Sequence, residues 1–156
     1  MLSVRVISIG KVKEKYFTDA ISEYMKRLKP MCKIEIIEIP ESRLPQSPSE
    51  KDIDASLIKE GSLILQKAEG ALFPLCIEGT QHSSQDFASL INRVMMSDGK
   101  LSFIIGSSHG LSHEVKEKGQ KISMSKMTFP HTLARVMLIE QIYRAMQINS
   151  GGKYHK

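Results

Sequence analysis

The stretch Phe103–Ser112, FIIGSSHGLS, joins an apolar run to a glycine-rich turn and then to a serine that precedes a charged segment. A short apolar run that ends at such a turn is typical of a buried strand. Gly106 and Gly110 permit a tight turn, and Ser112 is of a residue type that caps helices. The stretch therefore predicts a strand, a turn and a helix in that order, which is the repeating unit of an α/β fold.

The same alternation of patterns runs through the rest of the 156-residue chain. Short apolar runs that end at Gly or Pro alternate with segments whose apolar residues recur at helical spacing. We therefore predict an α/β fold, with a mostly parallel sheet and flanking helices, in a single domain of residues 1–156. The predicted strands span residues 4–9, 34–39, 72–77, 101–105 and a weaker 122–124, and the predicted helices span 17–28, 49–68, 84–95, a short segment from 112, and 130–148.

The composition indicates an ordinary globular protein of a reducing compartment. Hydrophobic residues make up 41% of the chain and charged residues 25%. The two cysteines, Cys32 and Cys76, lie far apart without a CxxC motif, which argues against a zinc site or a disulfide scaffold. No apolar run reaches the roughly 18 residues of a membrane span, and the first residues do not resemble a signal peptide. We therefore expect a cytoplasmic protein with no membrane partner.

The net charge of +5 is concentrated in one part of the chain. Residues 1–98 carry 13 Lys and Arg against 14 Asp and Glu, whereas residues 99–156 carry 9 against 3. A basic segment of this kind suits a polyanionic partner, of which nucleic acid is the commonest, and it suits plain solubility equally well.

The last predicted helix is apolar on nearly all of its faces. A single sheet can bury only one face of a helix, so it cannot bury all of these apolar side chains. This helix is therefore either central in the fold or half of a subunit interface. In the second case, Ile139 or Ile142 is expected to face the partner. The apolar positions are Leu133, Val136, Met137, Leu138, Ile139, Ile142, Tyr143 and Met146.

Ligands of open α/β sheets bind outside the carboxyl ends of the strands. In this chain those ends are residues 75–79, 106–110 and 125–131, so a site is expected where they meet. Gly106 has no side chain, which would let a ligand approach the backbone closely. A tight turn without a ligand explains the glycine equally well.

The carboxyl-terminal tail combines a flexible hinge with two chemically active side chains. Gly151 and Gly152 precede Tyr154 and His155, with a lysine on either side of the pair. These side chains could supply stacking, hydrogen bonding and proton transfer, whereas an inert frayed end is more common for such tails.

Residues 106–110 also fit G-x-S-x-G, the nucleophile-elbow pattern of α/β-hydrolases, with Ser108 as the nucleophile. The order of that triad would make Glu140 the acid and His155 the base. Glu140 stands one turn before Arg144, where an ion pair is the simpler use. The hydrolase is therefore an alternative with little support.

The common motifs of metal and nucleotide sites are absent. His109 and His113 have the spacing of a helical metal clamp, but Gly110 and Ser112 between them favour a turn. The chain has no P-loop and no G-x-G-x-x-G fingerprint. We therefore expect no metal.

Several motifs occur along the chain in a fixed order: G-K-V-K-E-K-Y at 10–16, I-I-E-I-P at 36–40, I-G-S-S-H-G-L at 105–111, S-K-M-T-F-P-H at 125–131, R-V-M-L-I-E-Q-I-Y-R-A at 135–145 and Y-H-K at the end. In these motifs the chain resembles, over essentially its whole length, the SPOUT-class (α/β-knot) methyltransferases that modify N3 of a pseudouridine in large-subunit ribosomal RNA. Ser107 stands where the family has a second glycine. This difference leaves open whether residue 107 touches a ligand or needs an unusual backbone angle.

The resemblance implies a trefoil knot at the carboxyl end, a homodimer, and S-adenosyl-L-methionine bound in the knot. Periodicity and spacing alone would not predict a knot, since threaded chains are rare. The positions that the family uses for the cofactor fall on the three strand ends named above. They are Leu75, Gly106, Met124, Ser125, Lys126, Met127, Thr128 and Phe129.

The resemblance further implies methylation of N3 of a pseudouridine in helix 69 of 23S ribosomal RNA, within assembled ribosomes and without a metal. The imino nitrogen must lose a proton, and the main task of the enzyme is to position it in line with the methyl group. From residue type and position, His155 is a candidate general base that reaches the partner subunit's site, Tyr154 a stacking platform, and Arg135 a contact to a phosphate or base carbonyl. A non-catalytic RNA-binding module is the other alternative.

Overall fold

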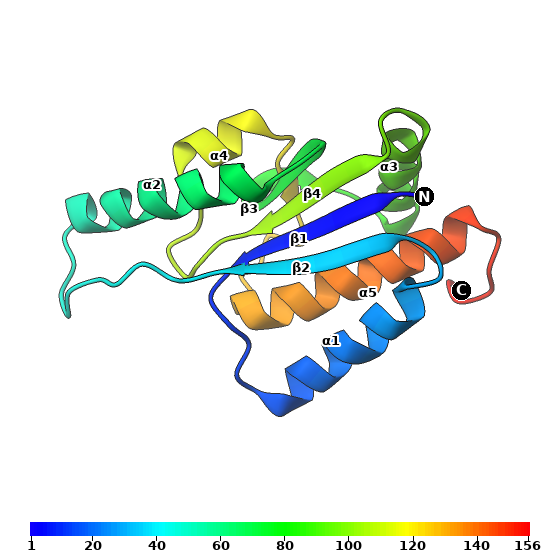
Figure 1. Cartoon of the computed structure of the whole chain (residues 1–156), viewed down its shortest axis with the longest axis horizontal. Helices are drawn as coiled ribbons and strands as arrows, with labels where there is room; N and C mark the ends of the chain where they lie inside the picture. Colours follow the sequence, from blue (N-terminus) through cyan, green and yellow to red (C-terminus); the bar gives the residue numbers. More distant parts are fainter.

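The computed structural model describes residues 1–156 as a five-stranded, all-parallel sheet with helices on both faces (Figure 1). The strands lie in the order β2-β1-β4-β3-β5. The predicted α/β fold class is confirmed, and every predicted strand and helix is present. The strands are β1 (Ser3–Ile9), β2 (Lys33–Ile39), β3 (Ala71–Gln81), β4 (Lys100–Ile105) and β5 (Ile122–Ser123), and the helices are α1 (Lys15–Leu28), α2 (Glu50–Lys67), α3 (Ser84–Met96), α4 (His113–Lys118) and α5 (His131–Asn149).

β3 is longer than the sequence predicts, because it pairs with a different neighbour at each end. Its pairing with β4 stops at Pro74, which has no N–H to donate to the ladder. Its pairing with β5 shifts register between Leu75 and Thr80 and then continues to Gln81. The irregularity therefore begins at Leu75, at the carboxyl edge of the sheet.

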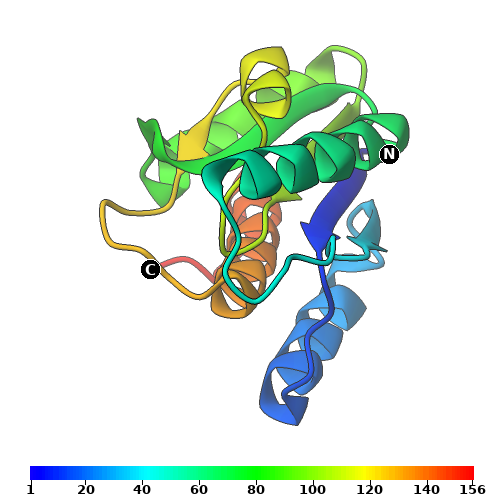
Figure 2. The same ribbon diagram turned by 90° about the vertical axis from the view of Figure 1, so that its left-hand side faces the viewer.

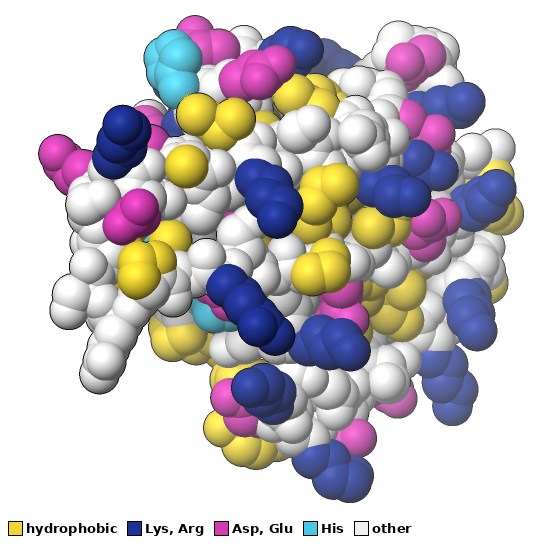
Figure 3. All heavy atoms as spheres, turned by 60° about the vertical axis from the view of Figure 1, so that its left-hand side comes forward, with side chains coloured by type: hydrophobic (Ala, Val, Ile, Leu, Met, Phe, Trp, Pro, Cys, Tyr) yellow, Lys and Arg dark blue, Asp and Glu magenta, His cyan; other side chains and the backbone are white.

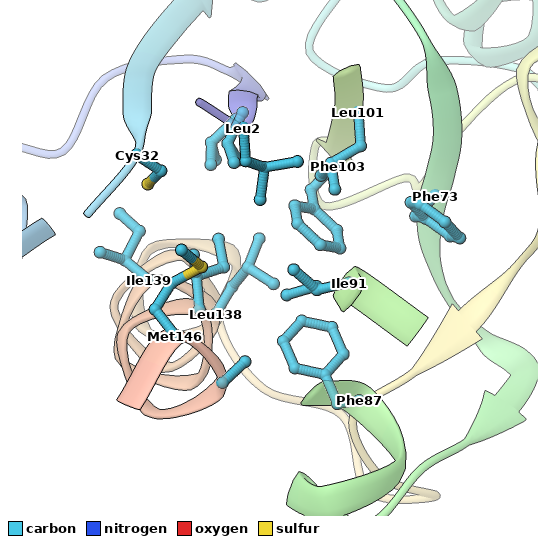
Figure 4. Close-up of a cluster of buried hydrophobic side chains, with 14 of the residues drawn as sticks. Leu2, Cys32, Phe73, Phe87, Ile91, Leu101, Phe103, Leu138, Ile139 and Met146 are labelled. Carbon is cyan, nitrogen blue, oxygen red and sulfur yellow. The ribbon is translucent and has the colours of Figure 1, made fainter. Parts of the chain in front are cut away.

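Alternating side chains of the strands build one core on each face of the sheet. On one face Val6 and Phe103 meet α1, α3 and α5 in a cluster of 21 buried residues. Figure 4 shows part of this cluster, in which the rings of Phe87 from α3 and Phe103 lie 5.6 Å apart. On the other face Ile7 and Ile104 meet α2 and α4 in a cluster of 7 buried residues.

α5 is a central helix of the larger core. It runs below the sheet in Figure 1 and packs against both α1 and α3. Ile139 and Ile142 are both 0% exposed. The expectation that one of them faces a partner subunit is therefore wrong, because α1 and α3 cover the sides that a single helix on a sheet would leave open.

Close packing of α2 and α4 holds the loop after β4 at the carboxyl edge of the sheet. Ser112 caps α4, as the sequence predicts, by accepting a hydrogen bond from the backbone N–H of Val115 at 3.3 Å. Gly61 of α2 lies directly against Ser112, where an added Cβ atom would overlap the serine hydroxyl. The loop between β4 and α4 is thus fixed at both ends.

Candidate functional site

The turn between β4 and α4, residues 106–110, forms one wall of the site. The backbone N–H of Gly110 donates to the carbonyl of Ser107 at 2.9 Å, and Gly110 has a φ of 86°. A Cβ atom at Gly106 would overlap the Gly110 carbonyl. The closure of the turn itself therefore requires glycine at 106, and the room that the missing side chain would leave for a ligand stays a prediction.

Ser107 fits the turn without an unusual backbone angle, since only glycines have a positive φ in this structure. Its hydroxyl accepts a hydrogen bond from the backbone N–H of His109 at 3.3 Å. The serine that replaces the second glycine of the family therefore stabilises the turn by a hydrogen bond inside it.

The segment between β5 and α5 forms the opposite wall. The Ser123 hydroxyl donates to the Ser125 carbonyl at 3.0 Å, and the Ser125 hydroxyl accepts from the backbone N–H of Met127 at 3.0 Å. Residues 125–129 take no part in the backbone-to-backbone hydrogen bonds found outside the helices and strands. Side-chain hydroxyls thus shape the segment, and most of its backbone N–H and C=O groups have no partner within the protein.

A pocket of about 680 Å³ lies between these two walls. Its volume falls within the roughly 300–1,000 Å³ typical of small-molecule and cofactor sites. In Figure 2, where the carboxyl edge faces the viewer, the orange segment that leads into α5 curves along this edge. The structure brings together seven of the eight predicted cofactor residues, Leu75, Gly106, Met124, Ser125, Met127, Thr128 and Phe129, while Lys126 is exposed and lies outside the lining.

The pocket also contains a pair of charged side chains that the sequence patterns did not indicate. Lys116 of α4 and Glu78 near the end of β3 form an ion pair with an N–O distance of 2.8 Å. The hydrogen bond from Lys116 lowers the pKa of the Glu78 carboxyl, and the same bond raises the pKa of Lys116. Glu78 could have been found from its place at a strand end, whereas Lys116 becomes its neighbour only through the packing of α4.

The carboxyl-terminal tail folds back onto α5 of its own chain and is not a frayed end. The Tyr154 hydroxyl donates to Glu140 at 3.3 Å, and its ring packs edge-on against Tyr143 with a centroid distance of 4.7 Å. Burial, together with the neighbouring Tyr24 and Glu140, raises the pKa of Tyr154 to about 12. The phenol is therefore a neutral hydrogen-bond donor at physiological pH.

His155 is held between α3 and α5. Its Nε2 lies 3.0 Å from the side-chain amide of Gln85, and its Nδ1 lies 3.1 Å from Nη1 of Arg144. A guanidinium can only donate hydrogen bonds, so a neutral ring accepts from Arg144 at Nδ1 and carries its proton on Nε2, which is satisfied when Gln85 turns its amide oxygen toward the ring. Neither Tyr154 nor His155 lines the pocket of its own chain, and Figure 1 shows the C terminus near the end of α5 that is remote from the pocket.

Arg135 lies in the interior, where α5 meets the ends of β1 and β2. Only 2% of its surface is exposed. Its Nη1 donates to the Glu38 carboxylate at 2.7 Å, and its Nη2 donates to the Gly10 carbonyl at 3.1 Å. The predicted contact of Arg135 with a phosphate or a base carbonyl would require release of these bonds, and it stays a prediction.

A family model described as "Predicted SPOUT methyltransferase" matches residues 2–155. The chain belongs to the SPOUT methyltransferase family. This SPOUT methyltransferase is 45% identical to proteins named "Ribosomal RNA large subunit methyltransferase H" from Bacillus thuringiensis (strain Al Hakam), Bacillus cereus (strain B4264) and Bacillus anthracis. Each match spans 159 aligned residues and covers 99% of this chain and 100% of the relative. The family resemblance read from the motifs is thereby confirmed.

The three residues of the alternative serine hydrolase do not converge within this SPOUT methyltransferase. Ser108 is exposed in the turn that lines the pocket. Glu140 is paired with Arg144 at 2.6 Å, as its position one turn away predicts, and neither Glu140 nor His155 lines the pocket. The candidate nucleophile therefore has neither its base nor its acid beside it.

The two closely spaced histidines of this SPOUT methyltransferase do not share a helix. α4 begins at His113, whereas His109 stands in the preceding turn. No group of three or more His, Cys, Asp or Glu side chains is placed to hold a metal ion. None of the helices is both long and apolar enough to span a membrane.

Proposed function

We propose that this chain is an S-adenosyl-L-methionine-dependent methyltransferase that methylates N3 of a pseudouridine in helix 69 of 23S ribosomal RNA, within assembled ribosomes. The observation that carries the proposal is the pocket, where two separate segments meet at the positions that the family uses for its cofactor. The name of the Bacillus relatives, with 45% identity over their full length, supports ribosomal RNA as the substrate class. Such a substrate would place the protein in the cytoplasm of a bacterium.

The residues of the pocket fit the parts of S-adenosyl-L-methionine. Leu75, Met124 and Phe129 offer apolar surface for the adenine ring, and the backbone groups of 125–129 offer donors and acceptors for its edge. The ion pair of Glu78 and Lys116 places one charge of each sign at the pocket, which suits a ligand with a carboxylate and an ammonium group. When bound, the cofactor supplies a methyl group on a positively charged sulfur, so the reaction requires no metal to activate it.

The chain's own residues must orient the acceptor base and accept the proton from N3. Positioning of the reacting groups can lower such a barrier by about 7–11 kcal/mol. We propose His155 as the proton acceptor, through the Nδ1 lone pair that Arg144 occupies in the free chain. The ring of Tyr154 offers a face on which the target base can stack.

A homodimer would bring the tail of one chain to the pocket of the other, which the proposal needs because the tail does not line its own pocket. A groove of about 470 Å³ between α1, α3 and α5 is lined in part by Phe87, Val136 and Met137. Val136 and Met137 are half-buried in the single chain, and they replace Ile139 and Ile142 as the proposed dimer contacts. The trefoil knot implied by the family resemblance is proposed together with this dimer.

Calorimetry with S-adenosyl-L-methionine tests the proposal together with single-turnover methyl transfer to ribosomes that lack the modification. We expect saturable cofactor binding, methylation of N3, and a dimer in light scattering at micromolar concentration. A chain that binds ribosomes but no cofactor would be an RNA-binding module instead. Labelling of Ser108 by a serine-reactive phosphonate would support the hydrolase, and a monomer would refute the shared site.

A further inference from the structure

The loop between β1 and α1 carries the sequence Gly10-Lys11-Val12-Lys13-Glu14. Lys11 and Lys13 are exposed, and neither forms an ion pair or a side-chain hydrogen bond. Lys15, at the start of α1, is instead paired with Asp19 at 2.7 Å. The loop therefore offers two lysine ammonium groups that are outside any ion pair, although Glu14 follows them and the Glu41 carboxylate lies beside Gly10.

This loop leaves the sheet next to the turn of residues 106–110. In the pairing of β1 with β4, Ser8 lies opposite Ile105. The next residues of the two chains, Ile9 and Gly106, follow at the same edge, where neighbouring parallel strands are about 4.8 Å apart. Figure 3, which brings this side of the molecule forward, shows Lys and Arg side chains across the middle and lower parts of the face.

Arg135 ties the base of the loop to the wall of the pocket. Its guanidinium holds the Gly10 carbonyl at 3.1 Å and the Glu38 carboxylate at 2.7 Å, at the ends of β1 and β2. Arg135 lies one turn inside α5, and the residues before it at the start of this helix, His131 and Ala134, line the pocket. A buried guanidinium that donates hydrogen bonds to two partners holds Gly10 and Glu38 against the start of α5, and so restrains the base of the loop relative to the pocket wall.

We infer that the β1–α1 loop is a phosphate-binding edge for the RNA substrate, with Lys11 and Lys13 as the contacting residues and Arg135 as the residue that positions the loop. The inference rests on the proposed function. A nucleotide whose base enters the pocket brings its own 5′ and 3′ phosphates to the rim. Lys11 and Lys13 do not line the pocket, but they follow the strand that pairs with β4, so they are placed for phosphates that lie beyond the pocket itself. Lysine ammonium groups are point charges, which fix the position of the RNA backbone without reading its sequence.

The Lys11→Gln/Lys13→Gln double variant tests the edge. We expect its affinity for cofactor in calorimetry to equal that of the native protein, while its Kd for unmodified ribosomes rises roughly tenfold at moderate salt. The slope of log K against log salt should fall by about 1.4, since each phosphate contact on a single strand contributes roughly 0.7. The matched control is Lys29→Gln/Lys33→Gln, which removes two exposed charges at the opposite edge of the sheet.

Equal losses in the two double variants would overturn the inference, because they would show an effect of total charge only. An unchanged salt slope in the loop variant would overturn it as well. Failure of the native protein to bind cofactor would instead count against the proposed function.

The anchor is tested by Glu38→Gln, which keeps an acceptor for Arg135 but removes the charge at a half-exposed side chain. We expect a higher KM for ribosomes, with kcat and cofactor affinity kept. A fall in kcat with KM unchanged would contradict a positioning role.

Discussion

Removal of Lys153–Lys156 should abolish methylation while leaving the fold and the cofactor pocket almost unchanged. In the free chain Tyr154 donates to Glu140, packs against Tyr143 and lies with its ring centroid 4.8 Å from the Arg144 guanidinium. Each hydrogen bond contributes about 0.5–1.5 kcal/mol, and the aromatic and cation–π contacts contribute about 0.5–1.5 kcal/mol each.

The tail is therefore close to neutral for stability. With the two contacts of His155 to Gln85 and Arg144 included, the gross stabilisation is about 3–7 kcal/mol. Fixing the backbone of the four removed residues costs about 4–8 kcal/mol of conformational entropy. At the midpoints of these two ranges the free energy of unfolding changes by about 1 kcal/mol, which corresponds to a shift in Tm of about 2–4 °C.

Single-turnover methyl transfer to unmodified ribosomes measures the functional loss, with calorimetry and thermal melting on the same samples. We expect His155→Ala to lose roughly 10²–10⁴-fold in rate if His155 is the general base. Lys153→Gln/Lys156→Gln keeps both rings and is the matched control for the charge of the tail. Full activity of the truncated protein would remove Tyr154 and His155 from the site, and a loss below about tenfold in His155→Ala would leave it a positioning role only.

Gly106→Val should abolish cofactor binding in calorimetry, because its Cβ would overlap the Gly110 carbonyl and open the turn; native affinity would show that the turn can adapt. Ile142→Asp should unfold or aggregate the chain, since a buried, unpaired charge costs several kcal/mol. Circular dichroism and light scattering test this, and a folded monomer would instead place Ile142 at a subunit interface. Glu60→Gln should raise the Tm at pH 7, because it replaces a buried charged carboxylate by a neutral amide. Burial raises the pKa of the Glu60 carboxyl, and the hydrogen bond from the Ser42 N–H at 2.9 Å offsets this only in part. A raised pKa means that the folded state binds the proton of Glu60 more tightly than the unfolded state does. The native protein therefore loses stability as pH rises above about 4.3, the usual pKa of a glutamate. Near pH 4 the native protein and Glu60→Gln should have the same Tm.

Local pattern was sufficient to predict the elements and the place of the pocket. The apolar run that ends at Ile105 and the serine at 112 predict a strand and a helix because their signals depend only on neighbouring residues. Alternation of such pairs makes the sheet parallel, and a parallel sheet gathers the ends at 75–79, 106–110 and 125–131 along one edge. The pocket therefore follows from order along the chain, without knowledge of any contact.

Contacts between distant segments were decided only by the tertiary structure. Periodicity shows that α5 is apolar on several sides, but α1 and α3 determine that Ile139 and Ile142 face the core. The partner of Arg135, Glu38, lies 97 positions away, and nothing in the spacing of charges indicates which of the many acidic residues it meets. The tail likewise reads as a frayed end until Tyr154 is seen against Tyr143. The physical reason is the same in each case. The sequence pattern indicates whether a residue is buried, whereas the packing of whole helices and strands determines which residues it contacts.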